Sequence, residues 1–162
     1  MRNISHIFAA LVFLIFTSFF IINWQVRGSS LIFSCSSYFT QDNKRGDFYM
    51  VSNTLMSFSL DRKGFISMDG SVTHQGKNYK FRRDYTFTYK NAGGNKWQLL
   101  DVEVMLAGSD EVPLGMIERN FFDSGNNKNG KYIYVAQVKD IPDAWVVGGL
   151  YTPAFICVNK ED

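Results

Sequence analysis

The N-terminal segment constrains the fold of this chain most. No Asp, Glu, Lys or Arg occurs between Asn3 and Val26, and most residues there are Phe, Ile, Leu, Val or Ala. An apolar helix of about 20 residues matches the ~30 Å hydrocarbon core of a bilayer. The sequence therefore predicts a short cytoplasmic tail at residues 1–3 and a transmembrane helix over residues 4–24, with Trp24 at the membrane interface.

The orientation of this predicted span follows from the amount of chain on each side. Only a few residues precede it and nearly the whole chain follows, so we expect the C-terminal part to be exported. Arg2 before the span and Arg27 after it give a weak positive-inside bias. A cleaved signal peptide is the alternative, but the run ends in Phe-Phe-Ile-Ile-Asn-Trp, without the small residues of a cleavage site.

The net charge of +2 comes from Arg2 and Arg27, which flank the predicted span. The 17 basic residues include these two, so the others balance the 15 acidic residues. A nucleic-acid-binding domain needs a basic surface. We therefore expect no direct contact between the exported part and nucleic acid.

The two cysteines, Cys35 and Cys157, lie near opposite ends of the part predicted to be exported. In an oxidising compartment, an even number of cysteines predicts a disulfide, and the alternative is two buried free thiols. Two distant cysteines and one exported histidine do not supply the ligands of a zinc site. We therefore predict a Cys35–Cys157 disulfide, no metal and no cofactor.

Composition changes along the exported part. Residues 25–46 are rich in Ser, Asn, Gln and charge, which indicates a juxtamembrane linker. Over residues 47–162, short runs rich in Phe, Tyr, Val, Thr and Ile alternate with turns that contain Gly or Asn. This pattern is typical of an antiparallel β-meander, so the predicted fold class is mainly β, with one exported domain over residues 47–162.

Three turns predict how the first strands pair. Loops at residues 61–64, 75–78 and 92–95 all place the same apolar residues on one face, and a one-residue slip would exchange the faces. The expected pairs include Leu60 with Ile66, Val72 with Phe81, and Phe87 with Leu100. The predicted core face consists of Met56, Phe58, Leu60, Ile66, Met68, Val72, Phe81, Tyr85, Phe87, Leu100, Val102, Val104 and Leu106.

The second half of the domain has a weaker pattern. Further strands are predicted at residues 116–122, 131–139 and 154–158, separated by loops at 123–130 and 141–153. A meander of adjacent hairpins closes most simply into a small barrel, and a disulfide from the domain entrance to the last strand would hold its seam. A β-sandwich is the alternative.

Arg83 is the exceptional member of the predicted core face, between Phe81 and Tyr85 and opposite Gly70. A buried unpaired charge is costly, so Arg83 needs a carboxylate, carbonyl groups, a stacked ring or an anionic ligand. If the third loop had five residues instead of four, Arg83 would face Glu103 in an ion pair. Phe81, Arg83 and Tyr85 are therefore the candidate site, and a structural charge is favoured over a bound ligand.

Residues suited to catalysis are sparse in the exported part. His74 is its one histidine and no nucleophile motif accompanies it, so neither a Ser-His-Asp triad nor a zinc site can be assembled. Asp101 and Glu103 share a face, but it is the predicted solvent face. We therefore expect a protein that is not an enzyme. An eight-stranded barrel interior holds either packed side chains or one small ligand.

Several features of this sequence occur together in one known family. They are the N-terminal span, the Cys35 region, residues 64–70 beginning Gly-Phe-Ile, residues 79–89 with Arg83 and a closing Thr-Tyr, and the late Cys157. In these features the chain resembles the FidL-like family of small enterobacterial inner-membrane proteins. The family implies no known catalytic residues.

The resemblance also implies a cellular context. FidL is encoded beside a membrane-anchored winged-helix regulator of the ToxR and CadC type, and the layout is similar to ToxS and VtrC, which pair with such regulators. By this analogy we expect a single-pass protein of the bacterial inner membrane, with a cytoplasmic N-terminus and a periplasmic domain that modulates such a regulator. The alternative is a periplasmic protein that binds a small amphipathic ligand or maintains the envelope.

Overall fold

The computed structural model describes residues 11–18, 30–43, 46–121, 131–149 and 155–159. Among these residues, no helix has the length and hydropathy needed to cross a membrane. Residues 11–18 are helical, and the remainder of the span predicted over residues 4–24 lies outside the described residues, as does the tail at residues 1–3.

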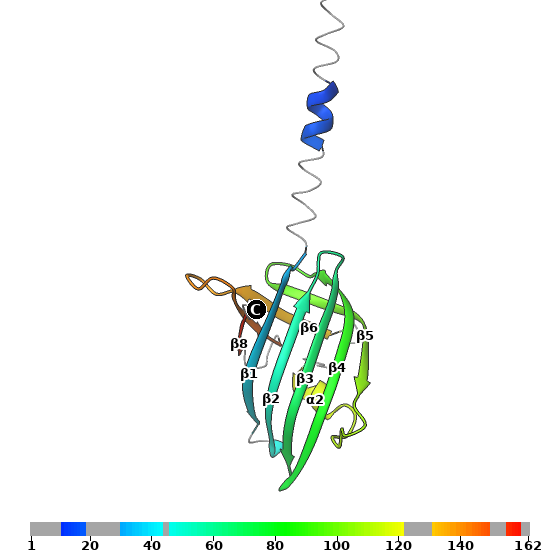
Figure 1. The fold of residues 1–162 in the computed structure, drawn as a ribbon, viewed down its shortest axis with the longest axis vertical. Helices are drawn as coiled ribbons and strands as arrows, with labels where there is room; N and C mark the ends of the chain where they lie inside the picture. The colour runs from blue at the N-terminus through cyan, green and yellow to red at the C-terminus, as the bar shows by residue number, and fades with distance from the viewer. Residues whose placement is uncertain (1–10, 19–29, 44–45, 122–130, 150–154, 160–162) are drawn as a thin grey trace, which may run out of the picture.

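In the described part of the chain, eight antiparallel strands form a closed barrel (Figure 1). Each strand pairs with the next one in sequence, and β8 returns to pair with β1. The strands are β1 (Phe33–Asn43), β2 (Phe48–Phe58), β3 (Lys63–His74), β4 (Lys77–Asn91), β5 (Lys96–Leu106), β6 (Lys131–Gln137), β7 (Ala144–Gly148) and β8 (Phe155–Val158). The predicted β-barrel is confirmed, and the sandwich alternative is wrong.

Alternation along the strands creates the core, because successive side chains of a strand point to opposite faces. In β2, every second residue from Phe48 to Phe58 is buried inside the barrel. Eight residues of the predicted core face are buried: Met56, Phe58, Ile66, Met68, Val72, Phe81, Tyr85 and Phe87. Val102 and Val104 are partly buried and pack against this core.

The first two turns differ from the prediction in position or length, yet the faces are those predicted. Met56 pairs with Ile66, which leaves Leu60 in the turn, 50% exposed and outside the core. The second turn consists of Gln75 and Gly76 alone, with φ angles of 51° and 72°, as a two-residue type I′ hairpin requires. Both registers shift by an even number of residues, so no side chain changes face.

The β4–β5 turn is longer than the predicted four residues, because Asn91 pairs with Trp97. As a result Trp97 and Leu99 point into the core, whereas Leu100, which was expected there, is only half-buried. A bulge farther along β5 shifts the register again. Leu106 was also expected in the core and is 45% exposed.

Three further predictions about secondary structure are wrong. Half of the linker predicted over residues 25–46 is β1, which belongs to the barrel. Residues 116–121 of the strand predicted at 116–122 form the short helix α2 (Met116–Phe121), and β7 lies within the stretch predicted as a loop at 141–153. The strands predicted at 131–139 and 154–158 are confirmed as β6 and β8.

The seam of the barrel lies between β1 and β8. Cys35 and Cys157 form a disulfide across it, as predicted. The two cysteines are 122 positions apart in the sequence. Beside this bond, Ser36 pairs with Val158, and the Ser37 hydroxyl donates a hydrogen bond to the Ile156 carbonyl at 2.8 Å. Because β8 is short, the disulfide is the strongest link at this edge.

The chain enters the barrel next to Tyr89. The hydroxyl of this buried residue accepts a hydrogen bond from the Leu31 amide (3.0 Å) and lies 2.7 Å from the Leu31 carbonyl and 2.8 Å from the Ser59 carbonyl.

We expect Tyr89→Phe to lower the free energy of unfolding by about 1–2 kcal/mol, because the buried Leu31 amide loses its acceptor. Urea denaturation in detergent measures this loss, and Tyr49→Phe, at an exposed position, is the control. Equal midpoints for the two variants would contradict it.

Candidate functional site

The candidate site is built around Arg83, whose side chain points from β4 into the barrel. It follows Phe81 and precedes Tyr85 on the inward face, and it is 0% exposed. In the observed register it pairs with Met68, not with Gly70 as expected. A guanidinium in this position needs several hydrogen-bond acceptors, because burying an unpaired charge costs several kcal/mol or more.

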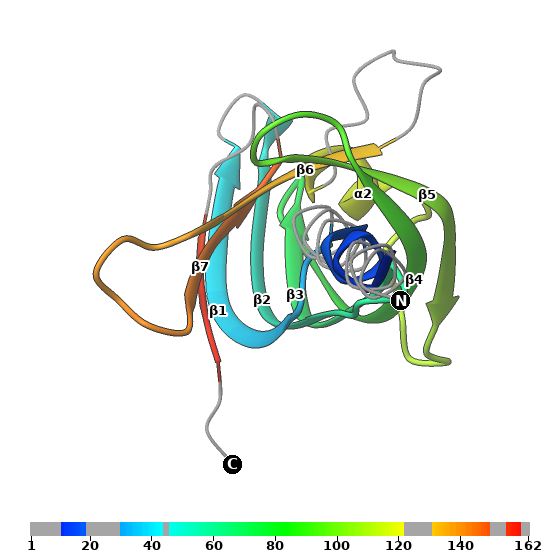
Figure 2. The ribbon, with the colours of Figure 1, turned by 90° about the horizontal axis from the view of Figure 1, so that it is seen from above.

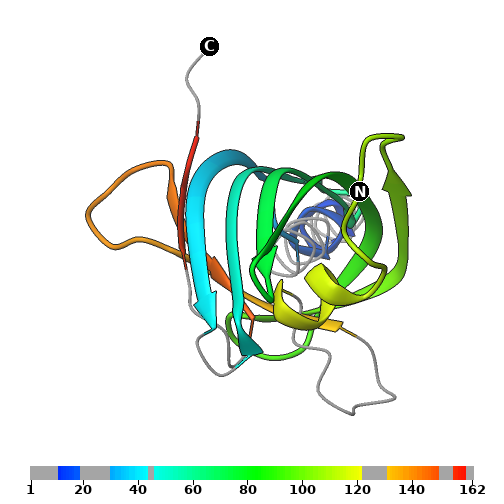
Figure 3. The ribbon, with the colours of Figure 1, turned by 90° about the horizontal axis from the view of Figure 1, so that it is seen from below.

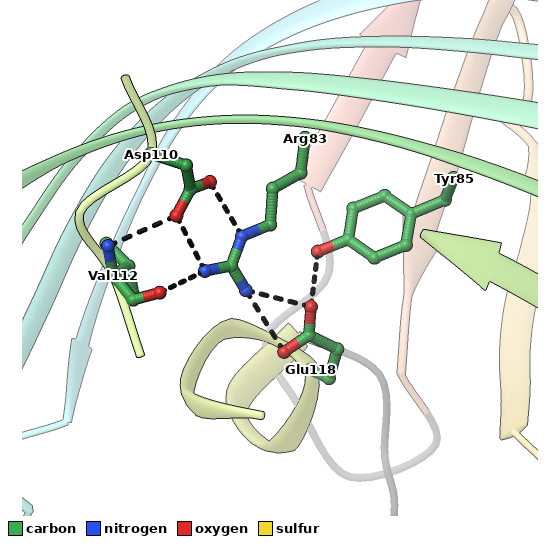
Figure 4. Close-up of polar contacts among 5 residues, drawn as sticks. All are labelled: Arg83, Tyr85, Asp110, Val112 and Glu118. Carbon is green, nitrogen blue, oxygen red and sulfur yellow. Dashed lines mark hydrogen bonds and ion pairs between the residues drawn. The ribbon is translucent and has the colours of Figure 1, made fainter. Parts of the chain in front are cut away.

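The chain itself supplies these acceptors (Figure 4). Arg83 Nε and Nη2 each donate to a carboxylate oxygen of Asp110 at 2.8 Å, in a bidentate pair. Nη1 donates to both oxygens of Glu118, at 2.9 and 3.2 Å, and Nη2 also donates to the Val112 carbonyl. Bidentate charge-assisted pairs are among the strongest hydrogen bonds in proteins. The guanidinium is therefore neutralised within the described residues.

Tyr85 extends the network, since its hydroxyl donates to Glu118 at 2.9 Å. Burial, together with the charge of Glu118, raises the pKa of Tyr85 far above its usual value. The hydrogen bonds to Asp110 raise the pKa of Arg83 although burial opposes this change. Burial alone would raise the pKa of Glu118, but hydrogen bonds from its own backbone and from Tyr85, with the charge of Arg83, lower it overall. At neutral pH, Glu118 is thus ionised, Arg83 is charged and Tyr85 is neutral.

The two carboxylates come from the segment that follows β5. The Asp110 amide donates to the Ala107 carbonyl, and the Val112 amide donates to Asp110 Oδ1, so a tight turn fixes the first carboxylate. Glu118 lies on α2, which sits inside the lower opening of the barrel (Figure 3) with Ile117 fully buried. The network therefore holds the segment after β5 and α2 against the barrel wall.

Sequence reasoning found one half of this site. Phe81, Arg83 and Tyr85 share the inward face of β4. Of the partners considered for Arg83, namely a carboxylate, carbonyl groups, a stacked ring or an anionic ligand, the structure provides two carboxylates and one carbonyl. The alternative that it faces Glu103 is wrong, because Glu103 pairs with Thr86 and is exposed. Asp110 and Glu118 were missed. Asp110 could have been found from the sequence, because it is the first acidic residue after β5 and the last residue of β5 pairs with Arg83.

Other candidate groups have simpler environments. His74 ends β3 at the barrel rim, where its Nδ1 lies 3.0 Å from the Asp47 carbonyl. Asp101 and Glu103 are on the outer surface, as predicted. Within the described ranges, no group of three or more His, Cys, Asp or Glu could hold a metal ion.

Comparisons with known proteins leave the family open. No family model matches the chain, and neither a curated protein nor a solved structure gives a match. The resemblance to the FidL-like family stays a prediction.

Proposed function

We propose that this chain is a single-pass protein of the bacterial inner membrane whose periplasmic barrel binds and modulates a partner protein, without catalysing a reaction. The partner we propose is a membrane-anchored transcription regulator of the ToxR or CadC type. The observation that carries the proposal is the internal neutralisation of Arg83 by Asp110 and Glu118. Because carboxylates of the same chain neutralise this buried charge, it provides no site for an anionic ligand. We therefore propose that the outer surface of the barrel recognises the partner protein.

Two observations support the proposed location. The Cys35–Cys157 disulfide is typical of an oxidising compartment such as the periplasm. The helical residues 11–18 expose their large apolar side chains, among them Phe13 at 68% and Phe16 at 72%. Lipid is the solvent in which such a helix surface is stable.

The location is tested with reporters fused after Asp162. We expect alkaline phosphatase, which is active only after export, to be active in this fusion, and green fluorescent protein, exported unfolded, to be dark. The same reporters fused after the first few residues of the chain are not expected to show export. A fluorescent fusion at Asp162 would place the barrel in the cytoplasm and refute the proposal.

The function is tested by co-expressing the full chain with the winged-helix membrane regulator encoded nearest to its gene. We expect the two to co-purify from a mild detergent and the output of the regulator to change when the chain is deleted. An unrelated single-span protein with a periplasmic domain is the control. Recovery of the chain alone, with unchanged transcription, would refute this function.

A second candidate is binding of a small amphipathic ligand. It is favoured by an outer groove of about 440 Å³, in which Phe65 and Phe87 lie beside Lys63, Asp101 and Glu103. Native mass spectrometry of the protein released from membranes would show a bound lipid or amphiphile if this candidate is correct. A spectrum with protein mass alone would remove it.

A further inference from the structure

Part of strand β5 has a neighbour on one side only. β5 pairs with β4 along its length, but with β6 only over Lys96–Leu99. From Leu100 to Leu106, the second edge of β5 faces no strand among the described residues. Figure 2 shows β5 continuing down one side of the barrel, past its contact with β6.

The exposed edge has a defined set of backbone groups. The Ala107 amide donates to the Arg82 carbonyl, and the same register places Met105 opposite Asp84. In an antiparallel ladder, alternate residues direct their amide and carbonyl groups to the neighbouring strand. Val104 and Leu106 therefore direct theirs away from β4. An open edge of this kind is a template for an additional strand.

The side chains along the edge are suited to a protein partner. Val102 and Val104 are half-buried on the inner face, while Leu106 and Met105, on opposite faces, are 45% and 56% exposed. An added strand with apolar residues on its inner face would cover Val104 and Leu106.

The outer face of the same edge is acidic. Asp101 and Glu103 are exposed and line the groove of about 440 Å³ described above. Asp101 accepts a hydrogen bond from the Thr88 hydroxyl at 3.0 Å, and the ion pairs found among the described residues involve neither carboxylate. A second copy of this edge would bring like charges together, which is unfavourable. A strand with Lys or Arg on its outer face would be complementary.

We propose that the β5 edge from Leu100 to Leu106 binds an extended segment of the partner protein as an added strand, with basic residues facing Asp101 and Glu103 and apolar residues facing the barrel. This inference rests on the proposed function, since it states how the partner is held. The added strand forms hydrogen bonds with the backbone groups of Val104 and Leu106. The carboxylates of Asp101 and Glu103 favour a segment with basic residues.

The first test uses the full chain in detergent and two synthetic nine-residue peptides, one alternating Val with Lys and the other Val with Glu. We expect the Val–Lys peptide to bind, to protect the Val104 and Leu106 amides from hydrogen exchange, and to bind about tenfold more weakly to Glu103→Lys. Asp69→Lys, at an exposed position on β3, is the matched control and should leave binding unchanged. No protection at these amides, equal binding of both peptides, or an equal effect of the two variants would overturn the inference.

The second test separates this inference from the proposed function. Val104→Pro removes an amide that points away from β4, and proline is tolerated at such edge positions. We expect Val104→Pro and Glu103→Lys to abolish co-purification with the regulator, whereas Asp69→Lys should not. If both variants still co-purify like the wild type, the proposed function holds and the β5 inference fails. If the wild type does not co-purify, the proposed function fails, and the peptide test alone decides whether the edge binds strands.

Discussion

Replacing Arg83 by Met is expected to lower the free energy of unfolding by about 3–5 kcal/mol, because two buried carboxylates lose their shared cation. The side chains of Asp110 and Glu118 are 2% and 12% exposed, so water does not replace the guanidinium. Urea denaturation of the full chain in detergent measures the loss. Arg82→Met is the matched control, because Arg82 is the adjacent residue on the exposed face, and a change within about 0.5 kcal/mol is expected there.

The loss of stability at acid pH should be smaller in the Arg83→Met variant. In the wild type, the pKa of Glu118 is lower in the folded state than in the unfolded state. The ionised carboxylate therefore stabilises the fold at pH values above its unfolded pKa, and this stability is lost as the pH falls through its folded pKa. Without Arg83, the hydrogen bonds from the Glu118 backbone and from Tyr85 are left to oppose burial, so the pKa of Glu118 is lowered less and less stability is lost on acidification. Denaturation at several pH values measures the two slopes.

A triple variant tests whether the charges themselves are responsible. Arg83→Met combined with Asp110→Asn and Glu118→Gln leaves no unpaired charge, so we expect it to recover a large part of the lost stability. If Arg83→Met were as stable as Arg82→Met, the network would have no role in holding α2 against the barrel.

The sequence predicted the barrel half of the site but not its partners, for a physical reason. Strand alternation has a period of two residues, so it places Phe81, Arg83 and Tyr85 on the inner face whatever the loop lengths. Asp110 lies in an irregular turn, which has no period. Glu118 lies on a six-residue helix, too short to show a helical repeat, so its residues were interpreted as a strand.

The period of strand alternation also explains which parts of the fold were predicted wrongly. Hairpins predicted in the wrong register still gave correct faces where the shift was even, as at Met56 and Ile66. β1 was missed because its inward side includes Ser37 and Gln41 beside Phe33 and Phe39, so polar and apolar residues do not alternate clearly. Its place in the barrel depends on contacts with β2 and β8, which the local sequence does not encode.

Replacing both Cys35 and Cys157 by Ala is expected to lower the free energy of unfolding by about 4–5 kcal/mol, because the disulfide closes a very long loop in the unfolded chain. The residues it joins are 122 positions apart. Among the described residues, the β1–β8 seam is otherwise held by the pairing of Ser36 with Val158, one side-chain hydrogen bond and the stacking of Phe39 on Phe155 at 4.7 Å. We therefore also expect Phe155–Val158 to lose protection from hydrogen exchange, while β3 and β4 keep theirs.

The reducing agent dithiothreitol provides the control, since it should destabilise the wild type by a similar amount and leave the double Ala variant unchanged. Denaturation curves and hydrogen exchange then distinguish two effects of the disulfide, which are restriction of the unfolded chain and closure of the folded barrel. If β8 and β3 lose protection together, the disulfide acts only by restricting the unfolded chain, and the barrel opens as one unit. If β8 alone loses protection, the bond also closes the barrel in the folded state, because the remaining contacts of a four-residue strand are too few to hold the seam.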